Sequence, residues 1–375
     1  MMSLPRHIQL GSGLLTVNVV RAEWALDELC VFAARENPRR AFLVVSKVLG
    51  RHIPTRPSVM RASVRDLAAL VPDDLPGSVL VVGMAETAIC LGQGVHEELL
   101  KRLGRADILY LHSTRQMLDH SVLCRFEEPH SHASSHLVYR PDALDGAFAN
   151  PRSLIIVDDE ISTGTTIRNL AEELIACLPS IERVVAVTLT DWSLGSDWVS
   201  GMSRGCQVVS LLSGRLDMTT ASEAVREDFS FDKAAAALGN MTLHHNFGRL
   251  GRDDVADEGD VLADRLVLPP FARCRVLGTG EFTYPSFRIA ERLEIMGHDV
   301  VMQSTTRSPV QTGDMIRHKL SFADNYGTEV PNYVYNVDPA EPRMNIICHE
   351  TPPGSIDREL VTLLSAQLLA FGELS

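Results

Sequence analysis

Short apolar runs that alternate with segments of helical periodicity limit, more than any other feature, how the N-terminal half of this chain can fold. The segments 88–103 and 166–178 repeat apolar residues every three or four positions, as helices with one apolar face do. Strands that alternate with such helices pack into a parallel sheet. We therefore predict an α/β fold whose strands are Phe42–Val45, Val79–Val82, Ile108–Leu111, Leu154–Val157, Val184–Leu189 and Val208–Leu212.

The length of 375 residues allows two domains, since a domain typically has about 100 to 200 residues. The apolar pattern is less regular from 219 to 270, where we expect a helix at 221–238 and a solvated acidic stretch. We place a linker at 219–244, between a first domain at 1–218 and a second at 245–375. The second, smaller α/β domain is expected to contain strands Arg273–Leu277 and Asp299–Gln303 and helices Pro285–Met296 and Ile356–Phe371.

The net charge argues against a broad electrostatic grip on nucleic acid, because 48 acidic residues outnumber 35 basic ones. A phosphate-bearing ligand therefore needs a local site. No apolar run approaches the roughly 20 residues of a transmembrane helix, and the N-terminus lacks the basic-then-apolar layout of a secretion signal. We expect a cytoplasmic protein whose seven scattered cysteines are reduced core residues, since they form no C-x-x-C pair.

The strongest chemical signal is the run SLIIVDDEISTGTTIRNL at 153–170. A buried strand delivers Asp158 and Asp159 to its carboxyl end, where open α/β sheets bind ligands, and two carboxylates there can accept hydrogen bonds from a vicinal diol. The next residues supply hydroxyls and free backbone N–H groups at a helix N-terminus, which favours a phosphate: Ser162, Thr163, Gly164, Thr165 and Thr166. Diol and phosphate together indicate ribose 5-phosphate. The alternative, a Walker-B-like acidic strand end, lacks an accompanying G-x-x-x-x-G-K-[ST] motif.

The segment VDDEISTGTT resembles the phosphoribosyl pyrophosphate (PRPP) signature of type I phosphoribosyltransferases. The resemblance implies a Rossmannoid parallel sheet, similar to that of orotate phosphoribosyltransferase. It also implies that Asp158 and Asp159 hold the ribose hydroxyls and that the loop Ser162–Thr166 holds the 5-phosphate. Mg²⁺ is the implied cofactor, bound mainly through PRPP, with the two aspartates as its candidate protein ligands.

A second loop expected of a type I enzyme, for pyrophosphate, follows the strand Val79–Val82 and contains Met84, Ala85, Glu86 and Thr87. Small residues there let the backbone approach a diphosphate. Glu86 is an unusual residue beside a bound anion, because its carboxylate is itself negative. A direct contact of Glu86 with the substrate would therefore be made through Mg²⁺ or through a hydrogen-bond donor of a ring. The alternative role is that of an ordinary acid at the N-terminus of a helix.

The long polar stretch Ser113–Tyr139 is expected to form a mobile lid, as long loops in compact domains often do. Arg115 and Arg125 would neutralise the departing pyrophosphate, and three histidines would donate to it or act as acids: His130, His132 and His136. Their H-x-H-x3-H spacing also fits a metal site, and a plain solvated loop is the third possibility. The stretch contains no lysine, unlike the corresponding loop of orotate phosphoribosyltransferases.

Lys47 and His52 are candidates for contacting the acceptor base, because the N-terminal region of type I enzymes helps to cover it. A positively charged surface turn is the alternative. The strand end Thr190–Trp192 is a further candidate for the acceptor pocket.

The second domain carries small polar residues at two predicted strand ends. At one of them, a guanidinium beside hydroxyl groups would bind a phosphate or carboxylate through Thr305, Thr306, Arg307 and Ser308. A capped turn is the alternative. The motif Thr306–Pro309, together with HNFGRLGR and GTGEF, resembles the TRSP domain that follows phosphoribosyltransferase domains in bacterial tellurite-resistance and stress-response gene clusters.

We therefore expect an Mg²⁺-dependent phosphoribosyltransferase, a glycosyltransferase of the pentosyltransferase class, that moves ribose 5-phosphate from PRPP to a base-like acceptor and releases pyrophosphate. By resemblance, its product is a nucleotide-like metabolite and its assembly a homodimer. The net acidity and the lack of a long apolar run predict no nucleic-acid or membrane partners. The motifs do not define the acceptor. A PRPP-sensing or nucleotide-binding regulator without transferase activity is the alternative, and a second enzyme in the C-terminal domain is a third interpretation.

Overall fold

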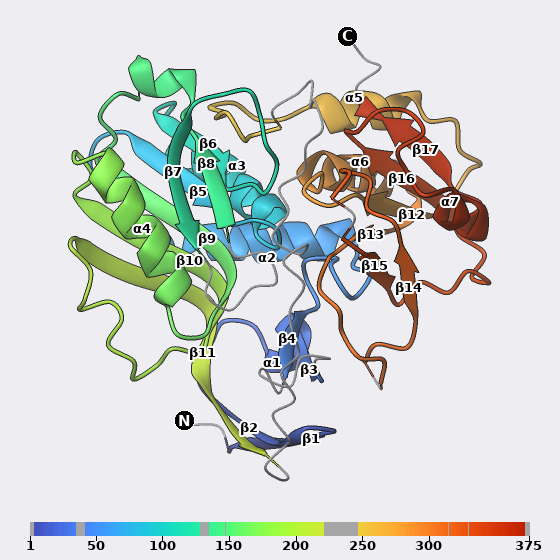
Figure 1. Cartoon of the computed structure of the whole chain (residues 1–375), viewed down its shortest axis with the longest axis horizontal. Helices are drawn as coiled ribbons and strands as arrows, with labels where there is room; N and C mark the ends of the chain where they lie inside the picture. Colours follow the sequence, from blue (N-terminus) through green and yellow to red (C-terminus); the bar gives the residue numbers. More distant parts are fainter. Residues whose placement is uncertain are drawn as a thin grey trace.

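Two open sheets with helices packed against them make up the computed structural model (Figure 1). The structure describes residues 4–34, 42–127, 135–146, 148–220, 247–313, 315–328 and 330–371. A seven-stranded sheet is built from the first part of the chain, and a four-stranded sheet from its C-terminal part. The prediction of an α/β fold with a second, smaller α/β unit is confirmed.

Five parallel strands form the body of the large sheet, and an antiparallel pair extends one side of it. Val79–Val82 and Leu154–Val157 are buried throughout, because strands covered on both faces need apolar side chains on both. In spatial order the strands are β1 (Arg6–Leu10), β2 (Gly13–Ala22), β11 (Gly205–Thr220), β10 (Arg183–Asp191), β9 (Ser153–Ile161), β5 (Val79–Gly83) and β6 (Ile108–His112).

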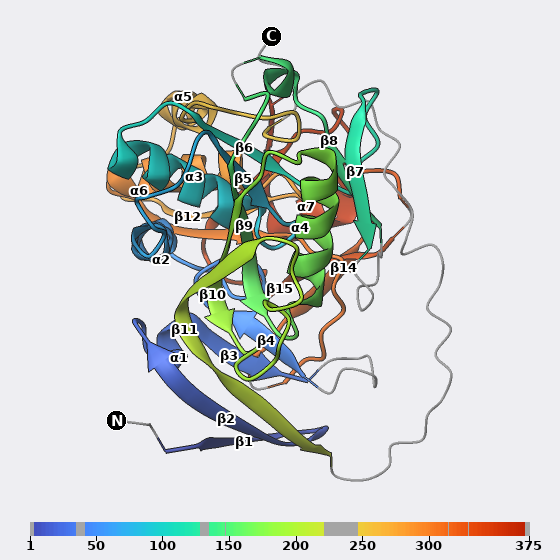
Figure 2. The ribbon, with the colours of Figure 1, turned by 90° about the vertical axis from the view of Figure 1, so that its left-hand side faces the viewer.

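Helices cover both faces of this sheet, as Figure 2 shows. α2 (Pro57–Ala69) and α3 (Ile89–Leu103) lie on one face, and α4 (Thr165–Cys177) lies on the other. α4 buries Leu170 and Leu174 on its apolar face, as the spacing of its apolar residues predicts. None of the described helices is both long and apolar enough to span a membrane.

Two antiparallel hairpins accompany the large sheet. The first consists of β3 (Cys30–Ala33) and β4 (Leu43–Ser46) and follows the short helix α1 (Leu26–Leu29). The second consists of β7 (Val122–Glu127) and β8 (Ser135–Tyr139), and the 3-10 helix η1 (Asp142–Asp145) follows it. The second hairpin occupies the segment in which we expected a lid, and its connection, with His130 and His132, lies outside the described residues.

The small sheet is parallel throughout. In spatial order its strands are β13 (Asp299–Ser304), β12 (Arg273–Gly278), β16 (Met344–His349) and β17 (Gln367–Ala370). The helices of this unit are α5 (Glu258–Arg265), α6 (Tyr284–Ile295) and α7 (Arg358–Leu364). A separate antiparallel pair is formed by β14 (Lys319–Phe322) and β15 (Asn332–Tyr335).

The structure corrects two predicted element ends. The single helix expected at 356–371 is wrong: α7 ends at Leu364, Ser365 follows with a φ of 45°, and the chain then forms β17 beside β16. Strand β9 continues to Ile161, past its predicted end at Val157, because β10 pairs with it over this extra length. The helix expected at 221–238 lies outside the described residues.

The two units cover an edge of each other's sheet. Thr55 pairs with Met302 on the edge strand β13, through N–H···O bonds of 3.1 and 2.8 Å. At the other bridge, Arg252 of the second unit pairs with Tyr110 on β6, the edge strand of the large sheet, through two backbone N–H···O bonds of 2.7 Å. These bridges give partners to backbone groups that an open edge would expose, and they hold the units together at two separate points.

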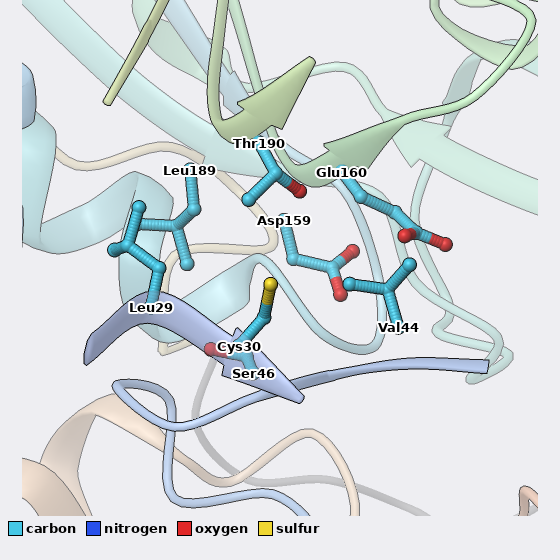
Figure 3. A pocket seen from close by; sticks show the side chains of 8 residues that line it. All are labelled: Leu29, Cys30, Val44, Ser46, Asp159, Glu160, Leu189 and Thr190. Atoms are coloured by element: carbon cyan, nitrogen blue, oxygen red, sulfur yellow. The ribbon is translucent and has the colours of Figure 1, made fainter. Parts of the chain in front are cut away.

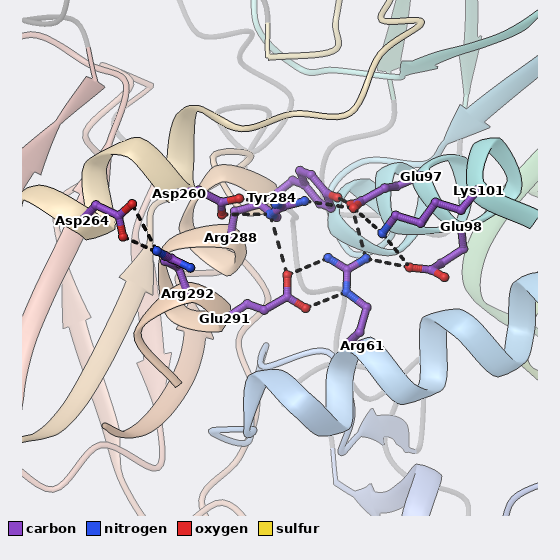
Figure 4. A network of polar contacts seen from close by, with 10 residues as sticks. All are labelled: Arg61, Glu97, Glu98, Lys101, Asp260, Asp264, Tyr284, Arg288, Glu291 and Arg292. Atoms are coloured by element: carbon purple, nitrogen blue, oxygen red, sulfur yellow. Dashed lines mark hydrogen bonds and ion pairs between the residues drawn. The ribbon is translucent and has the colours of Figure 1, made fainter. Parts of the chain in front are cut away.

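Helices of the two units are joined by ion pairs that we call the helix network (Figure 4). Its members are Arg61, Glu97, Glu98, Lys101, Asp260, Asp264, Tyr284, Arg288, Glu291 and Arg292. Arg61 of α2 donates to both carboxylate oxygens of Glu291 of α6, at 2.6 and 2.8 Å. Arg288 of α6 donates to Glu97 of α3 at 3.0 Å, and the side chain of Glu97 is only 4% exposed. Such well-formed, partly buried pairs fix the relative position of the two units.

Candidate functional site

The acids of the predicted PRPP motif lie on a step in the large sheet. β5 ends at Gly83, opposite Val157, whereas β9 continues beside β10 to Ile161. Asp158 and Asp159 therefore lie beyond the end of β5, beside the turn that follows it. This step is formed at the carboxyl ends of parallel strands, where open α/β sheets bind ligands.

One hydrogen bond joins the two loops predicted to bind the donor. Thr87, in the turn after β5, donates its hydroxyl to Asp159 Oδ1 at 2.8 Å. Asp158 Oδ1 accepts the backbone N–H of Asp159 at 2.9 Å. Burial raises the pKa of Asp159 above its ordinary value, although the hydrogen bond from Thr87 opposes this shift. The structure thus brings the turn at 84–87 and the two aspartates together.

The predicted 5-phosphate loop lies at the start of α4. Ser162 and Thr163 are exposed there, and Thr165 and Thr166 begin the helix. Gly164 has a φ of 77°, and a Cβ at this position would come within 2.2 Å of the Trp198 ring, so the turn requires glycine. Glycine offers no side chain to cap α4, and the N–H of Thr165 donates to Thr163 Oγ1 at 3.4 Å. The remaining N–H groups of this first turn suit an anion.

A small pocket lies between the β3–β4 hairpin and the step in the large sheet (Figure 3). Its lining residues are Leu29, Cys30, Val44, Ser46, Asp159, Glu160, Leu189 and Thr190. Figure 3 shows Asp159 and Glu160 on the side of the large sheet, across from Cys30 and Val44 of the hairpin. Burial, helped by Glu160, raises the pKa of the Cys30 thiol to about 12, so this side chain is neutral near pH 7. The walls of this pocket combine apolar side chains with the carboxylates of Asp159 and Glu160.

Glu86 lies among three guanidinium groups that we call the arginine cluster: Arg51, Arg115 and Arg307. Arg51 Nη2 forms a close ion pair with Glu86 Oε2. Arg115 Nη1 and Arg307 Nε lie 3.3 and 3.8 Å from Glu86 Oε1. Burial alone would raise the pKa of Glu86, but the three cations outweigh burial and lower this pKa to about 2. Glu86 is therefore ionised throughout the neutral range.

His136 supports Arg115 from within the β7–β8 hairpin. Arg115 Nη2 lies 3.1 Å from His136 Nε2, and because a guanidinium only donates, this ring nitrogen accepts. His136 Nδ1 then carries the proton and donates to Ser113 Oγ at 3.3 Å. Ser113 Oγ also accepts the N–H of Ala85 at 2.9 Å. His136 is fully buried and stacks on Phe126, so its contacts connect the hairpin to the turn after β5.

The turn Thr305–Ser308 uses its hydroxyl groups to hold its own shape. Thr305 Oγ1 accepts the N–H of Gly280 at 2.8 Å, and Thr306 Oγ1 accepts the N–H of Ser308 at 3.1 Å. The turn thus presents Arg307 to the first unit, with a side chain that is 9% exposed. The anion site predicted for the second domain therefore lies against the turn that contains Glu86.

A second contact between the units lies beside the arginine cluster. Glu281 of the GTGEF motif accepts the hydroxyl of Thr114 at 2.5 Å and the N–H of Arg115 at 2.7 Å. Arg249 of the HNFGRLGR motif pairs with Glu281 at 3.0 Å and donates to both oxygens of Glu350, at 2.7 and 2.6 Å. Burial would raise the pKa of Glu281, but Arg249 lowers it below its ordinary value. Both motifs of the second domain therefore lie in this interface.

Other predicted site residues lie elsewhere. Lys47 donates to a backbone carbonyl of α1, and His52 is buried against Tyr335, with 5.4 Å between the ring centroids. Neither lines the pocket, so their contact with an acceptor stays a prediction. Arg125 is exposed on β7. Thr190, at the predicted strand end, does line the pocket.

Three residues of the interface were not predicted as site residues: Arg51, Arg249 and Glu281. Each of them lies in a segment that the sequence singles out, either beside Lys47 and His52 or in a motif of the second domain. The sequence does not show which acid each arginine meets, because their partners come from distant segments.

Comparison with known proteins covers both units. A family model described as phosphoribosyl transferase matches residues 29–215, and one described as the TRSP domain C-terminal to that family, PRTase_2, matches residues 243–366. No curated protein matches the chain.

Similar solved structures include three phosphoribosyltransferases. Adenine phosphoribosyltransferase from Rhodothermus marinus is 13% identical over 49% of this chain and 95% of that chain, with a TM-score of 0.34. The Giardia lamblia APRTase complexed with 9-deazaadenine is 15% identical over 51% of this chain and 98% of that chain, with a TM-score of 0.35. Orotate phosphoribosyltransferase from Aeropyrum pernix is 18% identical over 48% of this chain and 84% of that chain, with a TM-score of 0.28.

Proposed function

The chain is a member of the phosphoribosyltransferase family with a C-terminal TRSP domain, and we propose that it transfers ribose 5-phosphate from PRPP to a nitrogenous heterocyclic acceptor. The hydrogen bond from Thr87 to Asp159 carries this proposal. It joins a turn suited to the diphosphate to acids suited to the ribose hydroxyls. The exposed start of α4, which follows the acids in the chain, would bind the 5-phosphate.

Transfer breaks the bond between the anomeric carbon and a diphosphate oxygen, and it forms a bond from that carbon to an acceptor nitrogen. The electron pair of the broken bond leaves with pyrophosphate, and the proton of the acceptor nitrogen passes to the released pyrophosphate or to water. Positive charge therefore develops on the sugar and negative charge on the leaving group. Asp158 and Asp159 would hold the ribose hydroxyls, and cations beside the turn at 84–87 would stabilise the leaving group.

The acceptor would occupy the pocket between the β3–β4 hairpin and β9. Leu29, Val44 and Leu189 would contact the faces of its ring, and Glu160 would accept a hydrogen bond from a ring N–H. Closure of this space by the hairpin would exclude water, which otherwise competes for the anomeric carbon.

Mg²⁺ would bind this site mainly through the substrate. Carboxylate and diphosphate oxygens are ligands that Mg²⁺ prefers, so Asp158 and Asp159 are its candidate protein ligands. Within the part of the chain that the structure describes, no three His, Cys, Asp or Glu side chains gather in a way that would hold a metal ion. Mg²⁺ bound to PRPP would neutralise charge on the diphosphate.

Pyrophosphate release from PRPP, measured with Mg²⁺ and a panel of purine, pyrimidine and other heterocyclic acceptors, tests this function. We expect release that depends on one acceptor class, slowed about 1000-fold in the Asp158→Asn/Asp159→Asn variant. Asp142→Asn/Asp145→Asn is the matched control, since these two side chains of η1 are 97% and 66% exposed. Full activity of the first variant would overturn the site. PRPP binding without release for any acceptor would favour a PRPP-sensing regulator.

A further inference from the structure

The arginine cluster is held in place from both units of the chain. The backbone carbonyl of Gly50 accepts the N–H of Ser304 at 2.8 Å, and Arg51 Nη1 lies 3.4 Å from Ser304 Oγ. Arg307 follows Ser304 in the chain by three residues. Arg51 and Arg307 are therefore anchored to the end of the same strand, β13, and the interface presets their separation.

Arg307 is incompletely paired where it lies. Its Nε is 3.8 Å from Glu86 and its Nη2 is 3.9 Å from Asp324, and both distances exceed the length of a hydrogen bond, about 2.7 to 3.2 Å. Asp324 is already held by its own loop, where it accepts the N–H groups of Tyr326 and Thr328 at 3.1 Å.

Two guanidinium groups of the cluster keep unused donors. Arg307 Nη1 and Arg51 Nε are buried, and neither has a hydrogen-bond partner among the described residues. A buried donor without an acceptor destabilises a protein, so such groups usually mark a place for a ligand or another partner. These donors lie around Glu86, in the turn that we assign to the diphosphate.

Three cations lie around Glu86, and the next carboxylate, Asp324, is 3.9 Å from Arg307, so the cluster keeps an excess of positive charge and of donors. A diphosphate carries more charge and more oxygens than a carboxylate, and guanidinium groups bind such oxygens in pairs. We propose that the diphosphate of PRPP replaces the Glu86 carboxylate as the counter-anion of the arginine cluster, so that the TRSP domain supplies Arg307 to the transferase site. This inference rests on the proposed function. In the absence of substrate, Glu86 keeps the three arginines in place.

The site then divides into a part that spans both units and a part that belongs to the first. The diphosphate meets Arg51, Arg115 and Arg307. The ribose and its 5-phosphate meet Asp158, Asp159 and the start of α4, to which the second unit contributes no predicted residue. Pyrophosphate and ribose 5-phosphate are therefore separate probes of the two parts.

Calorimetric titration of the full chain with each probe, in the presence of Mg²⁺, tests the inference. For Arg307→Gln we expect pyrophosphate affinity to fall at least tenfold and ribose 5-phosphate affinity to stay within twofold. Arg307→Lys keeps the charge without the paired donors, so its pyrophosphate affinity should lie between the two. Arg292→Gln is the matched control, because Arg292 also belongs to the second unit but pairs with Asp264 at 2.7 Å on the surface.

The outcomes separate this inference from the proposed function. If the wild type binds both probes and Arg307→Gln binds pyrophosphate equally well, the inference is wrong and the proposed function stands. If the wild type binds neither probe, the proposed function fails and the inference fails with it. Loss of both probes in Arg307→Gln, at an unchanged melting temperature, would make Arg307 a general support of the site and would also overturn the inference. If Arg307→Gln does not fold, Arg307→Lys decides by the same comparison.

Discussion

Two ion-pair networks lie between the units of this molecule, and they differ in how completely their charges are paired. In the helix network five acids face four cations, and Arg61 alone donates to Glu291 at 2.6 and 2.8 Å and to Glu98 at 3.2 Å (Figure 4). In the arginine cluster three cations face Glu86, and Arg307 stays 3.8 Å away from it. We call the helix network saturated, because each of its charged groups has a hydrogen-bonded partner, and the arginine cluster unsaturated, because Arg307 forms no hydrogen bond with Glu86.

This difference separates a structural role from a binding role. Removing charges from water costs free energy, and only good geometry with many hydrogen bonds offsets that cost. The helix network meets this condition and fixes the two units against each other. The arginine cluster does not meet it, and its unused donors lie beside the turn after β5. By fixing the two units against each other, the saturated helix network keeps the unsaturated arginine cluster in position.

Replacing Glu86 should give the largest change in stability and should sharpen this contrast. In Glu86→Gln three buried guanidinium groups lose their shared counter-charge, so the free energy of unfolding should fall by about 3 to 5 kcal/mol. Pyrophosphate with Mg²⁺ should raise the melting temperature more in this variant than in the wild type, because no carboxylate competes for the site. Chemical denaturation and melting with and without pyrophosphate measure both effects.

The control for this variant is Glu182→Gln. Glu182 forms an exposed pair with Arg152 at 2.7 Å, and exposed pairs contribute little to stability, so we expect no measurable change. Wild-type stability of Glu86→Gln, or a smaller response to pyrophosphate than that of the wild type, would contradict the assignment of Glu86 as a replaceable counter-anion.

Replacing Arg61 should give a smaller loss of stability and no loss of binding. Arg61→Met keeps an unbranched side chain beside Phe287, whose ring centroid lies 5.0 Å from the guanidinium carbon. It leaves the carboxylates of Glu291 and Glu97 with fewer partners. We expect the free energy of unfolding to fall by about 2 kcal/mol, since Arg61 is partly exposed. Pyrophosphate affinity should stay within twofold in titration, and a tenfold loss would show that the two networks are not separate.

The sequence predicts one end of the site better than the other, and the reason is the distance between partners along the chain. The two acids, the glycine turn and the start of α4 are contiguous, so local rules of strand ends, positive φ and helix N-termini suffice to place them. Arg51, Arg115 and Arg307 come from three distant segments. Only the packing of the second unit on the first brings them to Glu86.

The same limit explains the predicted helix that the structure corrects. Residues 356–371 carry apolar side chains at helical spacing, yet Ser365 ends α7 and Leu368 and Leu369 pair with Ile347 and Cys348 of β16. A strand partner that is distant in sequence overrides local periodicity here. The N-terminal strands of the large sheet were not predicted either, and β2 is held by its pairing with the distant β11.

Acid should weaken both networks alike, and this is the smallest effect that we expect. In the unfolded chain Glu86 and Glu97 have ordinary pKa values. In the folded protein burial would raise both pKa values, but the three arginines around Glu86, and Arg61 together with hydrogen bonds from Lys101 and Tyr284 at Glu97, lower both to about 2. Their stabilising contribution is complete above the unfolded pKa and is lost as the pH falls from there toward the folded pKa. Between pH 7 and pH 4 each carboxylate should account for about 1 kcal/mol of lost stability.

Glu86→Gln and Glu97→Gln should each flatten this part of the stability profile by a similar amount, as denaturation at the two pH values would show. An effect confined to Glu97→Gln would mean that Glu86 is not ionised within the arginine cluster, and the comparison between a saturated and an unsaturated network would then fail.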